Sequence, residues 1–186
     1  MGDGWRGRSF RSSAQASSVV PTDAGRALGR ARPALFYNAT PALLAEFERV
    51  DEGAMARAAV ETFRADSGRM AGEGAHVAGL QLDVAGLQLD MDVPTRLLAR
   101  YGRVLKMARA SLPANTRLSV TGLPTWMNAP APPRETLEAV DFWVPHLYGA
   151  EIPSTAERLV PIASPEEVRR ASARAPGKPF YAGLAA

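Results

Sequence analysis

Two aspartates, Asp90 and Asp92, stand two residues apart at the end of a short apolar run. If that run is a strand, their side chains share one face, with a backbone separation of about 6 to 7 Å. Glycosidases use a carboxylate pair about 5 Å apart when retaining and about 6.5 to 9.5 Å apart when inverting, and side-chain rotamers span that difference. Like charges at such a spacing raise one pKa, so one carboxyl stays protonated as an acid. The pair therefore predicts an acid–base site in which Asp92 is the proton donor and Asp90 tunes it.

Other side chains able to bind or react stand at the ends of predicted strands: Asn38, Trp126, His146 and Tyr148. In a parallel (β/α) sheet these ends meet at one rim, together with the aspartate pair. Trp126 and Tyr148 would then stack on the apolar face of a pyranose. A histidine in an apolar strand is more typical of a core residue than of a base. The aspartate pair and His146 have suitable types for a metal site, but their spacing does not support one, and no cofactor is expected.

The acid pair also has a purely structural explanation. An Asp-x-Asp motif alone is weakly specific, and Pro94 and Thr95 follow it as a helix start. Turn geometry and the helix dipole therefore explain these acids as well as catalysis does. Nearby, Asp141 is expected to cap or pair locally, and Trp143 to lie in the core.

The phrase VAGLQLD occurs twice, at residues 77–83 and 84–90. Strand side chains alternate with a period of two, and seven is odd. One continuous strand through both copies would place the polar face of the first copy where the second copy has leucines. Only one copy can be the strand. We expect it to be the second, which runs directly into the helix start at Pro94, with the first copy as a surface insertion.

Short apolar runs alternate with amphipathic segments from residue 33 onwards. This alternation indicates right-handed βαβ units and a parallel sheet. The predicted fold class is α/β, a partial (β/α) TIM-like barrel with about five parallel strands. A closed barrel needs eight strands and typically about 250 residues, so we expect a shortened copy of a longer barrel. Strands are predicted at residues 33–38, 84–90, 118–123, 140–148 and 179–184, and helices at 41–50, 51–72, 95–112, 135–139 and 164–174, the last with a capping box from Ser164 to Glu167.

Residues 1–32 are expected to form a disordered basic tail ahead of one barrel domain at residues 33–186. This stretch is rich in Ser, Gly and Ala, lacks periodic apolar residues, and carries a net charge of +4. The rest of the chain then has a net charge of −1. Because the positive charge lies in the tail, the overall charge of +3 does not predict nucleic-acid binding.

The composition of the chain excludes several classes of protein and of functional site. The chain has no cysteine, which excludes disulfide scaffolds, thiolate zinc sites and cysteine nucleophiles. No apolar stretch of about 18 residues or more predicts a membrane span, and no apolar signal segment is visible at the N-terminus. A cytoplasmic location is therefore the default expectation, with export possible if the true start lies elsewhere.

Three segments together resemble a known family: VAGLQLDMDVPTRLLARYGRVLKMARASLP, LSVTGLPTWM and VDFWVPHLYG. They resemble a bacterial family catalogued as domain of unknown function 3142, over roughly residues 33–186. The resemblance implies a glycoside-hydrolase-like (β/α) barrel. The chain departs from this pattern in its doubled VAGLQLD and its small number of strands. It also resembles in part the D-x-x-D-x-D-x-E motif of chitinase-like barrels, but Pro94 stands where the acid glutamate would be, which counts against that chemistry.

The resulting hypothesis is a glycoside-hydrolase-like enzyme acting on or binding a polysaccharide. Two alternatives stay open, a non-catalytic carbohydrate-binding barrel and an inactive shortened fragment. The hypothesis assigns catalysis to Asp92 and Asp90, and substrate binding to Asn38, Trp126, His146 and Tyr148. A polysaccharide is the expected ligand, and the oligomeric state is not predicted.

Overall fold

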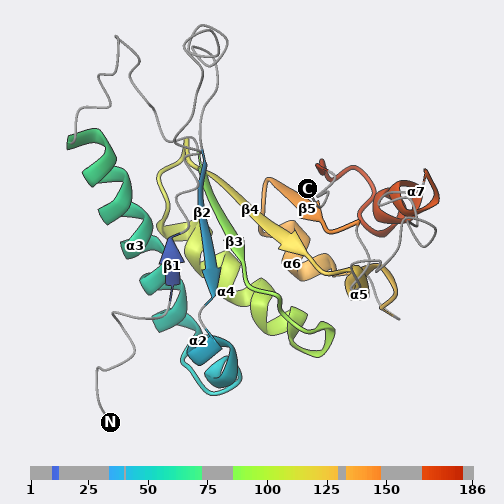
Figure 1. Cartoon of the computed structure of the whole chain (residues 1–186), viewed down its shortest axis with the longest axis horizontal. Helices are drawn as coiled ribbons and strands as arrows, with labels where there is room; N and C mark the ends of the chain where they lie inside the picture. The colour runs from blue at the N-terminus through green and yellow to red at the C-terminus, as the bar shows by residue number, and fades with distance from the viewer. Residues whose placement is uncertain are drawn as a thin grey trace, which may run out of the picture.

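The computed structural model describes residues 10–12, 34–39, 41–72, 86–129, 133–147 and 165–181. These residues form one five-stranded sheet, in the order β1-β2-β3-β4-β5, with helices packed against it (Figure 1). The strands are β1 (Phe10–Ser12), β2 (Ala34–Ala39), β3 (Gly86–Asp90), β4 (Arg117–Gly122) and β5 (Phe142–Pro145). The helices are α2 (Pro41–Glu46), α3 (Glu52–Gly72), η1 (Thr95–Leu97), α4 (Leu98–Ser111), α5 (Pro124–Met127), α6 (Arg134–Glu138) and α7 (Pro165–Arg174).

Strands β2 to β5 are parallel, and each pairs with the next one in the chain. Helices α3, α4 and α6 lie between successive strands, which confirms the α/β class. The predicted strand at 179–184 is reduced to a single parallel bridge between Trp143 and Phe180. The prediction of five parallel strands is therefore corrected to four, and the described strands form an open sheet that does not close on itself.

Strand β1 was not predicted. It pairs antiparallel with β2, with Phe10 opposite Ala39. Three residues of the expected tail are therefore part of the sheet. Most of residues 1–32 lies outside the described residues, so the disordered tail stays a prediction.

The second copy of the repeated phrase supplies β3, as expected. In the sheet, Leu87 and Leu89 are buried, and Asp90 is opposite Asn38 of β2. The first copy, residues 77–83, lies outside the described residues.

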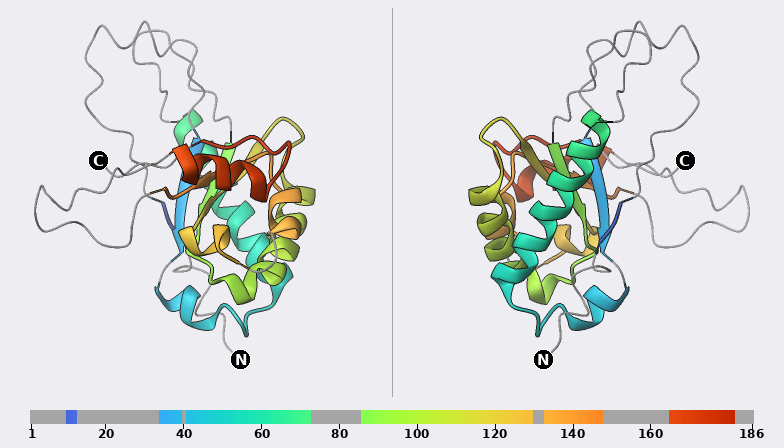
Figure 2. Two further views of the ribbon diagram at one scale, coloured as in Figure 1. Left: turned by 90° about the vertical axis from the view of Figure 1, so that its right-hand side faces the viewer. Right: turned by 90° about the vertical axis from the view of Figure 1, so that its left-hand side faces the viewer.

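The parallel sheet has two different faces. One face packs against α3 and α4, which lie on the same side of β2 (Figure 2). The side chains of this face are buried and mostly apolar: Tyr37, Leu87, Leu89, Leu118, Val120 and Trp143. Because side chains alternate along a strand, the opposite face carries the polar set Asn38, Gln88, Asp90, Ser119 and Thr121. The placement of Trp143 confirms the core role expected for it.

Specific contacts hold the helices in place. Asp51 accepts a hydrogen bond from the backbone N–H of Ala54 at 2.7 Å and so forms an N-cap at the start of α3. Helix α4 lies so close to α6 that a Cβ on Gly102 would be 2.8 Å from the carbonyl carbon of Glu135. Thr136 of α6 also donates a hydrogen bond to Leu98 O at 2.7 Å. Ser164 and the side chain of Glu167 lie outside the described residues, so the capping box expected before α7 stays a prediction.

Candidate functional site

The carboxyl ends of the parallel strands bring several predicted site residues to one edge of the sheet. Asn38 and Asp90 are neighbours across β2 and β3. Thr121 of β4 donates a hydrogen bond from its hydroxyl to Asp90 Oδ1 at 2.5 Å. His146 follows β5, and its backbone N–H bonds to Gly122 O at 2.8 Å. Three of the predicted residues, Asn38, Asp90 and His146, thus stand at the rim where (β/α) folds place their active sites.

Asp92 does not share a strand face with Asp90, so that part of the prediction is wrong. Strand β3 ends at Asp90, and Asp92 adopts a left-handed backbone with a φ of 43°. Aspartate tolerates this region better than most residues do. The side chain of Asp92 is exposed, while its neighbours Met91 and Val93 are buried.

The electrostatic surroundings of Asp92 differ from those of an ordinary surface aspartate. Partial loss of solvation raises the pKa of Asp92 above its usual value of 3.8. The charge of Asp90 raises this pKa further, and His146 acts in the opposite direction. Asp92 therefore lies within electrostatic range of both residues despite its turned backbone. A carboxyl whose pKa is raised beside a second carboxylate suits a proton donor.

The competing structural explanation is supported in part, because Asp92 occupies a turn with a left-handed backbone but caps neither helix that follows it. The N-cap position of η1 is Pro94, that of α4 is Leu97, and neither helix start has a side-chain cap. Asp141, in contrast, has the structural role expected of it. Its Oδ2 accepts hydrogen bonds from the backbone N–H of Leu118 at 2.7 Å and from the guanidinium of Arg109 at 3.0 Å.

Trp126 is not placed to stack on a ligand. Its side chain is only 1 % exposed, and its indole N–H donates to Val93 O at 2.8 Å. The ring packs edge-on against Tyr101, at a centroid distance of 6.4 Å. Trp126 therefore supports, from inside the core, the loop that carries Asp92. Its short helix α5 was not predicted. In the sequence, a single Trp after a strand carries no signal that distinguishes a ligand-stacking residue from a core residue.

The remaining predicted residues differ in what the structure says of them. Asn38 is half-buried, and its Oδ1 is buried without a hydrogen-bond partner among the described residues. Such an acceptor on the polar face of the sheet is available to a ligand or water. Tyr148 lies outside the described residues. Within the described ranges, no group of three or more His, Asp or Glu residues is placed to hold a metal ion.

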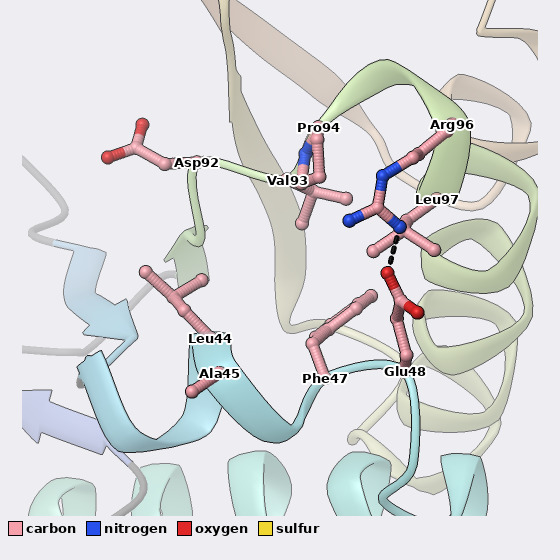
Figure 3. A pocket seen from close by; sticks show the side chains of 9 residues that line it. All are labelled: Leu44, Ala45, Phe47, Glu48, Asp92, Val93, Pro94, Arg96 and Leu97. Atoms are coloured by element: carbon pink, nitrogen blue, oxygen red, sulfur yellow. Dashed lines mark hydrogen bonds and ion pairs between the residues drawn. The ribbon is translucent and has the colours of Figure 1, made fainter.

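A cleft of about 370 Å³ opens beside Asp92, between α2 and the loop from β3 to η1 (Figure 3). Six of its nine lining residues are apolar, and Glu48 and Arg96 form an ion pair across one end. Asp92 stands at the other end, with its carboxylate directed away from that pair (Figure 3). The lining residues are Leu44, Ala45, Phe47, Glu48, Asp92, Val93, Pro94, Arg96 and Leu97. Sequence reasoning missed this cleft because its two walls are about 50 residues apart in the chain.

No curated protein and no solved structure matches this chain. Among the described residues, none of the helices has the length and apolar character needed to cross a membrane. Residues 41–156 match a family described as Domain of unknown function (DUF3142). The match covers more than half of the chain and includes β3, β4, β5 and the acid pair, although it is narrower than the resemblance expected over residues 33–186. The chain therefore belongs to the family Domain of unknown function (DUF3142).

Proposed function

We propose that this chain is a glycoside-hydrolase-like enzyme that acts on a polysaccharide, with Asp92 as the proton donor and Asp90 as the second carboxylate. The observation that carries the proposal is the raised pKa of Asp92 beside Asp90, at the edge where the parallel strands end. Asp92 does not cap either of the helix starts that follow it. A carboxyl with a raised pKa holds its proton to a higher pH than an ordinary aspartate does, and protonation of a glycosidic oxygen requires a carboxyl as proton donor.

The topology supports a (β/α) barrel as the scaffold. Doubly wound α/β sheets reverse their strand order at a switch point and carry helices on both faces. Here each parallel strand is followed by its neighbour without reversal, and α3 and α4 lie on one side. In a barrel the opposite, polar face would line the interior, and the edge with Asp90 and Asp92 would be the active-site end.

The proposed reaction uses both carboxyls. Asp92 gives its proton to the glycosidic oxygen as the bond from this oxygen to the anomeric carbon breaks. Asp90 assists at that carbon, either by taking a proton from the attacking water or as the nucleophile of a covalent intermediate that water then hydrolyses. The hydroxyl of Thr121 orients Asp90. Asn38 offers a hydrogen-bonding group to a sugar hydroxyl at the same edge.

The test is the release of reducing ends from a panel of soluble polysaccharides by the full chain and by Asp92→Asn. We expect the substitution to lower the rate about 100-fold or more. Asparagine tolerates the left-handed backbone at this position, so the melting temperature should stay close to that of the parent. Glu61→Gln, on the exposed side of α3, is the matched control and should retain full activity. Equal rates for Asp92→Asn and the parent would overturn the assignment.

The same experiment separates catalysis from binding alone. The burial of Trp126 removes an aromatic platform that a non-catalytic carbohydrate-binding barrel would use. Saturable binding of an oligosaccharide without release of reducing ends, unchanged in Asp92→Asn, would establish the binding protein instead.

A further inference from the structure

The cleft beside Asp92 has the size and lining of a small ligand site. Its volume of about 370 Å³ is at the lower end of the range of about 300 to 1,000 Å³ typical of ligand pockets. Leu44, Ala45 and Pro94 present accessible apolar surface. Phe47 and Val93 close it from the core side, with 2 % and 1 % of their surfaces exposed. Such a site accommodates one unit with an apolar face and a polar edge.

The cleft is built before any ligand binds. The wall formed by α2 and the turn after it is attached to α4 through Arg100. The guanidinium of Arg100 donates to the backbone carbonyls of Phe47, at 2.8 Å, and of Val50. It also pairs with Glu52 at 2.9 Å. The opposite wall is held by Trp126 through Val93 O. A ligand therefore meets preformed walls, which reduces the ordering cost of binding.

The charges of the cleft are unequal. Two carboxyls, Glu48 and Asp92, line it together with one cation, Arg96. Arg96 is already paired with Glu48, and Asp90 adds a further negative charge near Asp92. Among the described lining residues, therefore, no unpaired cation is present to bind an anionic ligand. An uncharged ligand avoids this repulsion, and its hydroxyls can bond to both members of the exposed ion pair.

We propose that this cleft is a specificity subsite that accepts an uncharged sugar unit and that the Glu48–Arg96 pair excludes uronate units. The inference rests on the proposed function of Asp90 and Asp92, and it names the class of substrate that this site would take. Glu48 and Arg96 act here as specificity-determining residues that neutralise each other.

The decisive variant is Glu48→Gln, which leaves Arg96 as an unpaired cation in the cleft. Both side chains of the pair are more than half exposed, so breaking it should leave the fold intact. The matched control is Glu46→Gln, because Glu46, the last residue of α2, is an exposed acid close to Glu48 in the chain that pairs with Arg49 but does not line the cleft.

Binding is measured by titration calorimetry with neutral xylohexaose and acidic hexagalacturonate, on the full chain carrying Asp90→Asn, which prevents turnover and keeps all the charged residues that line the cleft. We expect a preference of at least about tenfold for the neutral hexasaccharide. Glu48→Gln should raise affinity for the acidic one by about tenfold, with little effect on the neutral one. Glu46→Gln should change neither. Leu44→Trp, which fills the cleft, should lower affinity for the neutral hexasaccharide by about tenfold or more.

An unchanged ratio of the two affinities in Glu48→Gln would overturn the inference. Undiminished neutral binding in Leu44→Trp would do so too, as would no binding of either hexasaccharide at about 1 mM. These outcomes are distinct from failure of the proposed function, in which the parent and Asp92→Asn release reducing ends equally while the binding results stand.

Discussion

Asp92 combines an unusual backbone with an unusual titration. Its φ of 43° lies in a region that most non-glycine residues avoid, at a cost of about 1 to 2 kcal/mol that aspartate and asparagine partly escape. Non-glycine residues in this region often occur at functional sites. Because of this turn, the Asp92 side chain does not follow the alternation of β3. Partial loss of solvation and the nearby charge of Asp90 both raise its pKa.

The raised pKa of Asp92 predicts a pH-dependent stability. Because the folded protein favours protonated Asp92, that stabilisation is present below pH 3.8 and is lost as the pH rises through the raised pKa. At neutral pH the ionised Asp92 therefore opposes folding. We expect Asp92→Asn, which cannot ionise, to be at least as stable as the parent at pH 7, with its relative advantage decreasing towards pH 3.

Urea unfolding at pH 3 and pH 7 measures this difference, with Glu61→Gln as the control for loss of a surface carboxyl. A stability difference between Asp92→Asn and the parent that is the same at both pH values would contradict the assigned electrostatics. Asp92→Ala should be less stable than Asp92→Asn at every pH, because alanine tolerates the left-handed backbone less well.

At the scale of elements, the close approach of α4 to α6 depends on a residue without a side chain. A Cβ at Gly102 would lie 2.8 Å from the Glu135 carbonyl carbon and 2.9 Å from its oxygen. Backbone atoms cannot rotate away, so α6 would have to move. Gly68 in α3 is the natural comparison, since nothing within the described surroundings lies within 4 Å of its added Cβ.

The two glycines should respond in opposite directions to alanine. Gly102→Ala should destabilise the protein by about 1 to 3 kcal/mol through overpacking. Gly68→Ala should stabilise it by about 0.5 to 1 kcal/mol, because alanine is the better helix former. Thermal unfolding of both variants tests this, with shifts of about 2 to 4 °C per kcal/mol. A Gly102→Ala protein as stable as the parent would show that α4 and α6 are not in this contact.

At the scale of the whole molecule, the chain offers two identical segments for one place in the sheet. The second copy occupies that place as β3, directly before the loop of Asp92. Leu89 is 1 % exposed there. Use of the first copy would separate the strand from that loop by seven residues, and the carboxyl pair would lose its position at the rim.

This choice predicts different effects of equivalent substitutions in the two copies. Leu89→Ala should destabilise the protein by about 2 to 5 kcal/mol, as expected for a buried leucine. Leu82→Ala, its counterpart in the first copy, should change stability by less than about 0.5 kcal/mol. Chemical unfolding of the two variants makes the comparison, and equal losses would mean that both copies contribute to the core.

Local pattern was sufficient for much of this protein. The period-two alternation, the odd length of the repeat and the helix start after the second copy predicted that the second copy forms the strand, and β3 begins and ends within it. The alternation of apolar runs and amphipathic segments determined the order of β2 to β5 and their helices. It also placed Asn38, Asp90 and His146 at one edge, because parallel strands share the direction of their carboxyl ends.

Only the tertiary structure decided the properties that depend on contacts between distant segments. The burial of Trp126 depends on Tyr101 and on the carbonyl of Val93, and the turned backbone of Asp92 belongs to the loop that this contact holds. The pairing of β1 with β2 joins segments that share no local pattern. The cleft exists only where α2 meets the loop after β3, so its charge balance of Glu48, Arg96 and Asp92 follows from packing and from no feature of local periodicity.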